Sequence, residues 1–309
     1  MEILVNVILL VVGFAMLVKG ADWFVDGFAG AARKLGIPQL VVGLTIVAMG
    51  TSTPEAAVSI SAALKGTADI AIGNVVGSNI LNIFIILGIS AAIVNIAIQK
   101  STLKIEMPYM IFVTVVLIVM GWTGGYVTFV EGVILWILFL IYLGYLFMLA
   151  KKGTEEEQEK EERGIPRLLV MGIIGLVIVV WGSNITVDSA TAIATAVGIS
   201  ERFIGLTIVA LGTSLPELVT SVTAAKKGNA DIAIGNIVGS NIFNILFVIG
   251  TTALITPVVY ASNFFIDGIV AVAAGVVLWL AVVKHRELRR GWGIAMLLMY
   301  CAYFIYLLV

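Results

Sequence analysis

The sequence predicts an all-α polytopic membrane protein whose ten transmembrane helices form two inverted five-helix repeats, with the second and seventh helices broken. Three observations predict this fold. Of the 309 residues, 61% are hydrophobic and 12% charged, and the mean hydropathy of +1.12 is far above that of soluble domains. A polar stretch of the first half recurs in the second half. Lysine and arginine also gather in alternate loops, which is typical of membrane proteins.

Ten apolar runs, each long enough to cross a hydrocarbon core of about 30 Å as a helix, account for most of the chain. The first five lie near residues 3–31, 38–64, 69–97, 105–123 and 127–150. The second five lie near residues 167–196, 202–225, 231–257, 263–283 and 291–308. We therefore divide the chain into a first five-helix repeat (1–150), a charged cytoplasmic linker (151–166) and a second repeat (167–309). The first run is too long for a signal peptide and is expected to be a retained span.

The number of spans in each half determines how the halves are oriented. Because five crossings are odd in number, the second repeat enters the membrane from the side opposite to the first. With both termini outside, 15 of the 18 basic residues lie in cytoplasmic loops, and such a bias is the positive-inside arrangement. They are Arg33, Lys34, Lys100, Lys104, Lys151, Lys152, Lys160, Arg163, Arg167, Lys226, Lys227, Lys284, Arg286, Arg289 and Arg290. We therefore expect both termini on the extracytoplasmic side.

The composition and the motifs argue against several classes of protein. The single cysteine, Cys301, and the single histidine, His285, cannot build a disulfide framework or a Cys/His metal site. No basic patch with interleaved aromatic residues points to nucleic acid. No nucleophile constellation or phosphate-binding loop points to an enzyme, and we expect neither a prosthetic group nor an obligatory protein partner. The Glu/Lys-rich linker lacks the alternating Asp/Asn ligands of a calcium-sensing loop and is expected to be solvated.

One polar stretch is present twice. Residues 50–82 read GTSTPEAAVSISAALKGTADIAIGNVVGSNILN, and residues 212–244 read GTSLPELVTSVTAAKKGNADIAIGNIVGSNIFN. A shift of 162 positions aligns residues 43–88 with 205–250 without a gap, and 31 of the 46 aligned pairs are identical. Polar groups without partners are costly in a bilayer. A polar block that recurs among Val and Ile therefore indicates a functional site inside the membrane.

Pro54 interrupts the second span. Because proline has no amide hydrogen and clashes with the preceding turn, we expect the helix to break there and to free carbonyls near Ala48 and Gly50. A capping box between Ser52 and Glu55 is the purely structural interpretation of the same residues. It does not explain a carboxylate in the bilayer interior, which costs about 2.5–3.5 kcal/mol. Nor does it explain why the second repeat has the same carboxylate.

The third span carries a polar stripe. Asn74, Ser78 and Asn82 recur every four residues and lie on one slowly drifting face of the helix. The eighth span repeats the stripe as Asn236, Ser240 and Asn244. Hydrogen bonds between helices could account for such a stripe by themselves. Because it recurs beside each broken helix, we expect two broken helices and two amide-lined helices to meet at the centre of the protein.

All the candidate ligands are oxygen atoms. The two repeats supply the carboxylates of Glu55 and Glu217 together with hydroxyls, amides and freed carbonyls. The hydroxyls belong to Thr51, Ser52, Ser78, Thr213, Ser214 and Ser240, and the amides to Asn82 and Asn244. Calcium takes about six to eight oxygen ligands, whereas zinc or copper would call for imidazole or thiolate. Two glutamates neutralise one divalent ion or two monovalent ions, so competition for one site would be the physical basis of exchange.

The GTSxPE and GNxxGSNxxN blocks, duplicated in inverted halves, resemble those of the cation/calcium antiporter superfamily, closest to the small prokaryotic sodium/calcium exchangers. The resemblance covers the whole chain. It implies a multi-pass protein of the prokaryotic cell membrane that transports Ca²⁺ and Na⁺, with the site between the second, third, seventh and eighth helices. It further implies that the long first and sixth helices slide to switch access from one side to the other.

The resemblance also implies a role for each motif residue. Glu55 and Glu217 would be the principal metal ligands, and Thr51 and Thr213 would add carbonyl and hydroxyl oxygens. Ala48 and Ala210 would offer carbonyls to sodium. The shells would be completed by Ser52, Ser214, Ser78, Ser240, Asn82 and Asn244.

One departure from the family's pattern concerns charge. Several sodium-driven relatives carry an aspartate at one of the places held here by Asn82 and Asn244. With two fixed negative charges, three sodium ions would leave the site at +1, so a lower sodium count or protons on the glutamates stays open. A proton-coupled cation antiporter is therefore the nearest alternative function. A cation channel is another, because oxygen-lined sites also build filters, but a channel does not need two inverted copies of its site.

The first span also contains charged residues. Lys19, Asp22 and Asp26 lie late in it, where we expect snorkelling and local pairing rather than a role in ion coupling.

Overall fold

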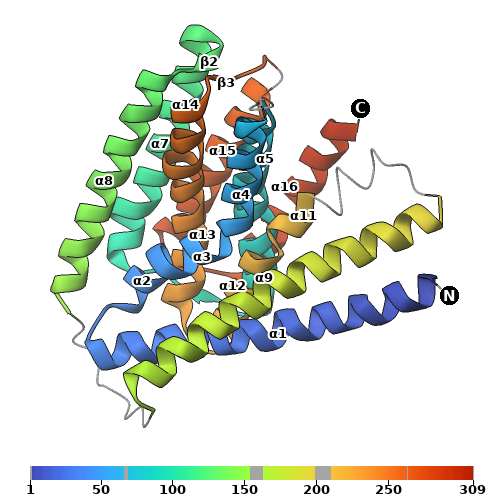
Figure 1. Cartoon of the computed structure of the whole chain (residues 1–309). Coiled ribbons are helices and arrows are strands. Elements are labelled where there is room, and N and C mark those ends of the chain that lie inside the picture. Colours follow the sequence, from blue (N-terminus) through green and yellow to red (C-terminus); the bar gives the residue numbers. More distant parts are fainter. Residues whose placement is uncertain (1, 66–68, 154–162, 199–209, 263, 309) are drawn as a thin grey trace.

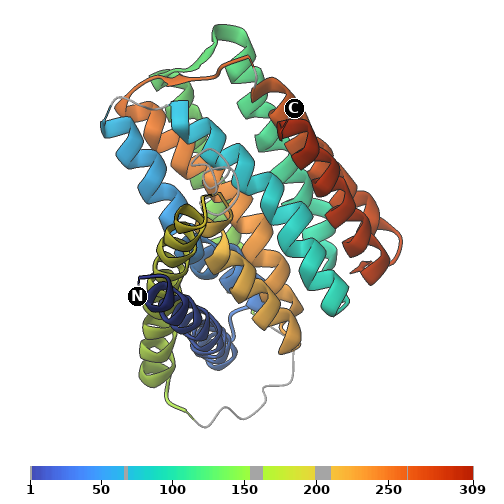
Figure 2. The same ribbon diagram turned by 90° about the vertical axis from the view of Figure 1, so that its right-hand side faces the viewer.

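The computed structural model describes residues 2–65, 69–153, 163–198, 210–262 and 264–308 as an almost entirely helical protein (Figures 1 and 2). Within these residues, eight helices are long and apolar enough to cross a membrane. A bent pair of helices, 39–51 and 53–64, adds a ninth span. The predicted span at 202–225 is described only from residue 210 onward, and residues 154–162 of the linker lie outside the described residues. Nine of the ten predicted spans are therefore present in the described part of the chain.

The helices of the first half follow the predicted order. They are α1 (Glu2–Leu35), α2 (Gln39–Val42), η1 (Gly43–Val47), α3 (Ala48–Thr51), α4 (Thr53–Leu64), α5 (Asp69–Leu81), η2 (Asn82–Leu87), α6 (Gly88–Ile93), η3 (Thr102–Glu106), α7 (Met107–Gly124) and α8 (Phe129–Lys151). Those of the second half are α9 (Ile165–Ala196), α11 (Ala210–Thr213), α12 (Leu215–Lys226), α13 (Ala230–Phe243), η5 (Asn244–Ile249), α14 (Gly250–Ile255), α15 (Phe264–Val283) and α16 (Arg290–Leu308).

Two helices form the buried centre. In the span that runs from α13 to α14, 94% of the most apolar 18-residue stretch is buried inside the protein, and in the span from α5 to α6 the buried share is 72%. The outer helices α8 and α16 bury only 22% and 11% of theirs. Their exposed side chains are mostly Ile, Leu, Val and Phe, which suit contact with lipid. The polar stripes are therefore carried by the helices that lie farthest from the lipid.

The predicted break in the second span is confirmed. Helix α3 ends at Thr51 and α4 begins at Thr53, and the helical segments 39–51 and 53–64 are bent by 49° relative to each other. Pro54 lies in the first turn of α4, where its missing N–H is not needed. The polar helices are also irregular, because each passes into a π-helical segment, η2 or η5, that begins at Asn82 or Asn244. Such wide turns occur often at functional sites.

Four short strands join the two halves of the chain. β1 (Ile96–Ala97) pairs antiparallel with β4 (Glu287–Leu288), and β2 (Tyr126–Val127) pairs antiparallel with β3 (Val258–Val259). Each pair contains one strand from the first half and one from the second. The loops at the ends of the bundle are therefore tied across the halves rather than within them.

The helices α1 and α9 lie side by side and run obliquely across the rest of the bundle (Figure 1). At about 1.5 Å per residue the 34 residues of α1 span about 51 Å, which is longer than the membrane's hydrocarbon core. Glycines allow the two backbones to touch: a Cβ at Gly20 would lie 2.9 Å from the carbonyl oxygen of Gly175. Close approach of this kind is typical of membrane helices packed through small residues.

Candidate ion-binding site

The two broken spans bring their glutamates into the protein interior. Glu55 lies in the first turn of α4 and Glu217 in the first turn of α12. Each is 1% exposed. A carboxylate is favoured at a helix N-terminus because the unpaired N–H groups there carry partial positive charge. The breaks thus place both carboxylates at positively polarised helix ends rather than inside regular helices.

Serine hydroxyls connect each broken helix to the glutamate of the other. Ser52 donates to Glu217 Oε1 over 2.8 Å, and Ser214 donates to Glu55 Oε1 over 3.2 Å. Neither serine makes a side-chain cap on its own helix. The capping-box interpretation of the first motif is therefore wrong, because the serine hydroxyl finds a carboxylate in the other half of the chain.

A second group of contacts lies between the amide-lined helices. Asn79 donates to the carbonyl oxygen of Asn241 over 3.1 Å, and Asn241 donates to that of Asn79 over 3.1 Å. Asn82 donates to Asn241 Oδ1 over 2.9 Å, and Asn244 donates to Asn79 Oδ1 over 3.2 Å. Sequence reasoning missed Asn79 and Asn241. The sequence pattern that could have predicted these two asparagines is the GSN triplet of each polar helix. The asparagine of each triplet lies three residues before a predicted ligand and therefore on the same helical face.

Four oxygen atoms of this region are buried without a hydrogen-bond donor. They are Oε2 of Glu55, Oε2 of Glu217, Oδ1 of Asn82 and Oδ1 of Asn244. A buried acceptor without a partner is costly. All four belong to predicted metal ligands, and all four are hard oxygen donors suited to Ca²⁺ or Na⁺. The residues present therefore fit a cation.

The other asparagines of the stripes hold the broken helices in place. Asn74 donates to the backbone carbonyl of Glu55 and, over 2.9 Å, to Ser59 Oγ. Asn236 makes the same pair of bonds, to the carbonyl of Glu217 and to Ser221 Oγ. For these two asparagines, the interpretation of the stripe as hydrogen bonding between helices is confirmed. They orient the helix turns that carry the carboxylates.

The hydroxyls of Thr51 and Ser240 lie close to the carbonyl oxygen of Ala48. Thr51 Oγ1 lies 3.3 Å from the carbonyl oxygen of Ala48 and 3.0 Å from Asn236 Oδ1. Ser240 also donates to the Ala48 carbonyl over 3.3 Å, and the N–H of Ser52 does so over 3.0 Å. The expectation of a free carbonyl at Ala48 is therefore wrong, because the helix continues to Thr51 before it breaks and Ser240 packs against it. In this structure, Ala48 would offer its oxygen to an ion only after these donors had moved.

The remaining predicted residues lie at the edges of the site. Ser78 is 3% exposed, and it borders a cavity of about 230 Å³. The cavity is lined by Gly73, Asn74, Val76, Gly77, Ser78, Leu81, Phe264, Asp267, Tyr300, Tyr303 and Leu307. Thr213 is half-buried at the end of α11. Ala210 is the first residue of α11, next to residues outside the described part of the chain.

The site contains few groups that would bind a soft metal. Within the described residues, no three His, Cys, Asp or Glu side chains are grouped as they would be around a metal ion. The described part of the site holds two carboxylates, with hydroxyls, amides and backbone carbonyls around them. The two carboxylates would balance one divalent cation or two monovalent cations, and hard oxygen ligands of this kind suit Ca²⁺ or Na⁺.

Comparisons with known proteins agree with this description. A model of the family described as Sodium/calcium exchanger protein matches residues 5–148 and 167–309. The inner membrane protein YrbG of Escherichia coli is 36% identical over an alignment of 308 positions, which covers 94% of this chain and 92% of that protein. The sodium/calcium exchanger MaX1 of Methanosarcina acetivorans is 31% identical over an alignment of 346 positions, which covers 99% of each chain.

A solved structure is similar over nearly the whole chain. It is that of the sodium-calcium exchanger NCX_Mj soaked with Na⁺ and Sr²⁺, and it matches with a TM-score of 0.86 and 34% identity over 97% of each chain. The family model covers both halves of the chain and omits only the linker and a few terminal residues. From its fold, its paired motifs and these matches, the chain belongs to the sodium/calcium exchanger family.

Proposed function

We propose that this protein is a secondary active antiporter that exchanges sodium for calcium at a central site built around Glu55 and Glu217. The observation that carries the proposal is the set of four buried oxygens without donors, two on the glutamates and two on Asn82 and Asn244. The exchanger relatives support the choice of ions. They are transporters rather than enzymes, in agreement with the expectation that this chain catalyses no reaction.

The charge of the site provides the coupling. Two carboxylates are balanced by one Ca²⁺ or by two Na⁺, and an additional ion would bring uncompensated positive charge into a low-dielectric interior. The divalent and monovalent ions therefore exclude each other. Besides the glutamates, we assign as ligands Thr51, Thr213, Ser52, Ser214, Ser78, Ser240, Asn82, Asn244, Ala48 and Ala210.

We further propose that the chain consists of two inverted repeats, 1–150 and 167–309, joined by the linker at 151–166, with ten spans and both termini on the extracytoplasmic side. The reciprocal contacts support this arrangement. The bonds of Ser52 and Ser214, of Asn79 and Asn241, and of Asn82 and Asn244 each recur with the halves exchanged. The crossed strand pairs support it in the same way.

Alternating access would then come from movement of α1 and α9 over the other helices. Their shared interface contains glycines whose backbones touch, so the two helices can move as one body. The contacts of this pair with the rest of the bundle include the turns that hold the site, because α1 packs on α12 and α9 packs on α11. A displacement of the pair would alter which end of the site is covered.

Proton-coupled cation exchange is a second candidate. Asn82 and Asn244 leave the site with two ionisable groups, and each glutamate has one oxygen without a partner on which a proton could reside. A cation channel has less support, since the crossed contacts join two halves of one site and do not outline a continuous pore.

Calcium-45 uptake into proteoliposomes tests the function. An outward-directed sodium gradient should drive uptake by the wild type, and Glu55→Gln or Glu217→Gln should abolish it. Glu131→Gln is the matched control, because Glu131 caps α8 at the surface and glutamine also closes a capping box. Uptake that persists in the Glu55→Gln variant would overturn the assignment of the site. A pH gradient that fully replaces sodium would favour proton coupling, and steady conductance without a counter-ion would favour a channel.

A further inference from the structure

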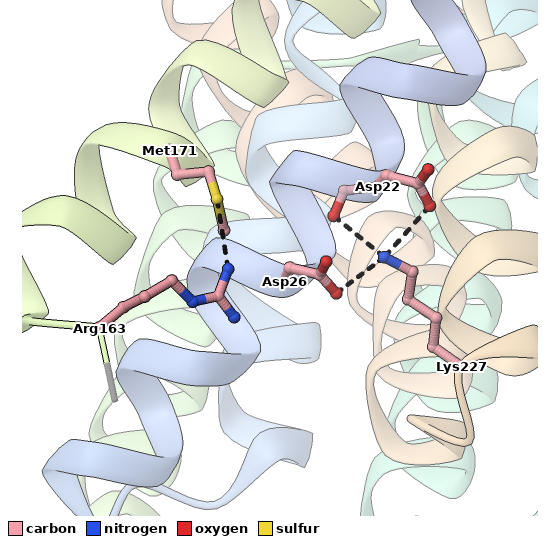
Figure 3. Close-up of polar contacts among 5 residues, drawn as sticks. All are labelled: Asp22, Asp26, Arg163, Met171 and Lys227. Carbon is pink, nitrogen blue, oxygen red and sulfur yellow. Dashed lines mark hydrogen bonds and ion pairs between the residues drawn. The ribbon is translucent and has the colours of Figure 1, made fainter. Parts of the chain in front are cut away.

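Three charged side chains join α1 to the end of α12. Lys227 Nζ lies 2.7 Å from Asp26 Oδ1 and 3.1 Å from Asp22 Oδ1. It also donates to the backbone carbonyl of Asp22 over 3.3 Å (Figure 3). These three contacts match the three N–H donors of a lysine ammonium. Asp22 and Asp26 are one turn apart and share a face of α1, so a single ammonium bridges two carboxylates.

This ion triad, which consists of Asp22, Asp26 and Lys227, lies where the α1 and α9 pair meets helix α12. Helix α12 carries Glu217 in its first turn, and Lys227 is the residue that caps its other end. Asp22 and Asp26 belong to α1, which packs along α9. The triad therefore ties the α1 and α9 pair to a helix of the ion site. In the proposed orientation it lies at the cytoplasmic end of the bundle.

Among the described residues, the equivalent positions of the other half do not form an ion pair with each other. With the shift of 162 residues, Lys227, Asp26 and Asp22 correspond to Lys65, Asp188 and Asn184. Lys65 caps α4 as Lys227 caps α12, and Asp188 lies on α9. Both side chains are exposed, and in the described part of the chain no ion pair joins them. Helix α9 also makes no contact with α4 as extensive as that of α1 with α12.

We propose that the ion triad is a positioning device that holds the cytoplasmic end closed, and that a Lys65 to Asp188 ion pair replaces it when the extracytoplasmic end closes. This inference rests on the proposed alternating access. The two contacts exclude each other, because the same rigid pair of helices cannot rest on α12 at one end and on α4 at the other at once. The three side chains of the triad are 28–39% exposed, so their pairing is weak enough to break during transport.

The unequal number of carboxylates biases the equilibrium. The cytoplasmic triad has two aspartates, whereas the extracytoplasmic pair would have only Asp188, because Asn184 is neutral. The state with the cytoplasmic end closed is therefore favoured, and it is the state of this structure. Adding a carboxylate with Asn184→Asp should shift the equilibrium in the same direction as removing the ammonium with Lys227→Met.

Cross-linking tests the proposed contact directly. Lys65→Cys and Asp188→Cys are introduced into the full chain with Cys301→Ser, which removes the only native cysteine, and a short bis-methanethiosulfonate reagent is applied in proteoliposomes. We expect a measurable cross-link whose yield rises about three- to tenfold when Lys227→Met is added. Lys227→Arg, which keeps the charge, should leave the yield unchanged. A cross-link that never forms, or a yield independent of residue 227, would overturn the proposal.

Transport kinetics separate positioning from a loss of structure. In oriented vesicles, Lys227→Met and Asn184→Asp should each lower the KM for calcium at the cytoplasmic face about three- to tenfold, because more of the protein is open to that face. The KM at the opposite face should not fall. A merely structural role for Lys227 would reduce the maximal rate or raise both KM values, and that result would count against the proposal.

The parent with Cys301→Ser separates failure of the inference from failure of the function. Sodium-driven calcium uptake by this parent, together with no effect at residue 227, would overturn the ion-pair exchange and leave the antiporter intact. No uptake by the parent, in vesicles where its insertion is verified, would overturn both.

Discussion

The Ser52 hydroxyl donates to the Glu217 carboxylate across the centre of the protein, over 2.8 Å, although 165 residues separate them in the chain. This bond and its counterpart, from Ser214 to Glu55, join the N-terminal turns of the two broken helices. Each carboxylate is thereby oriented by the opposite half.

Removing either serine should weaken calcium binding. A hydrogen bond to a charged group contributes about 1.5–3 kcal/mol, so Ser52→Ala should raise the KM for calcium by roughly tenfold or more. Ser214→Ala should have a smaller effect because its bond is longer, 3.2 Å against 2.8 Å. Calcium-45 uptake measures both. Thr53→Ala, which loses only an exposed bond to the Met49 carbonyl, is the control, and equal effects at Thr53 and Ser52 would contradict the prediction.

Replacing Asn82 or Asn244 by aspartate should change the stoichiometry. Each asparagine has a buried Oδ1 without a donor, so Asn82→Asp adds a third negative charge where a cation can reach it. The wild type, with two carboxylates, should exchange two sodium ions per calcium without current. The variant should carry a third sodium and become electrogenic, because its fixed charge offsets one more ion. Calcium uptake measured at clamped membrane potentials tests this prediction. Voltage-dependent exchange by the wild type would show that it does not exchange two sodium ions per calcium.

Truncating the paired asparagines should destabilise the protein. Asn79→Ala removes the side-chain donor to the buried carbonyl of Asn241 and the acceptor of the Asn244 side chain, at a cost of about 1–3 kcal/mol. Asn241→Ala should cost a similar amount, because it removes the reciprocal pair of bonds, to the Asn79 carbonyl and from Asn82. The costs should nearly add in the double variant, because the two bonds are separate and each runs from a side chain to a backbone carbonyl that alanine keeps. Thermal unfolding in detergent measures these differences, and single variants as stable as the wild type would contradict the prediction.

Enlarging a glycine between α1 and α9 should stop transport. A Cβ at Gly20 would lie 2.9 Å from a carbonyl oxygen of α9, so Gly20→Val must push the two helices apart. We expect a loss of at least tenfold in exchange rate, with a smaller loss for Gly20→Ala. Gly144→Ala on α8 is the matched control, because a Cβ there meets nothing within 4 Å. Exchange by Gly20→Val at the control's rate would show that close packing of these helices is not required.

The site was only partly predictable from the sequence. The duplicated motifs predicted Glu55, Glu217 and the asparagines of the stripes as candidates, because polar residues in an apolar chain are easily recognised. The pattern could not show that Ser52 contacts Glu217 rather than Glu55, since the two alternatives differ only in how distant segments pack. The same limit explains the error at Ala48, whose carbonyl is occupied by Ser240 from the other half of the chain.

The sequence by itself determined the membrane-spanning fold, the position of the helix break and the chemical character of the site. These depend on hydropathy, on proline and on the residue types of one local segment, all of which are read along the chain. Only the tertiary structure decided which oxygens are left without donors, which half supplies each hydrogen bond, and that Lys227 pairs with Asp22 and Asp26 while Lys65 does not pair with Asp188. Residues 43–88 and 205–250 are identical at 31 of 46 aligned positions, yet their contacts differ, because contacts depend on how distant helices pack against each segment.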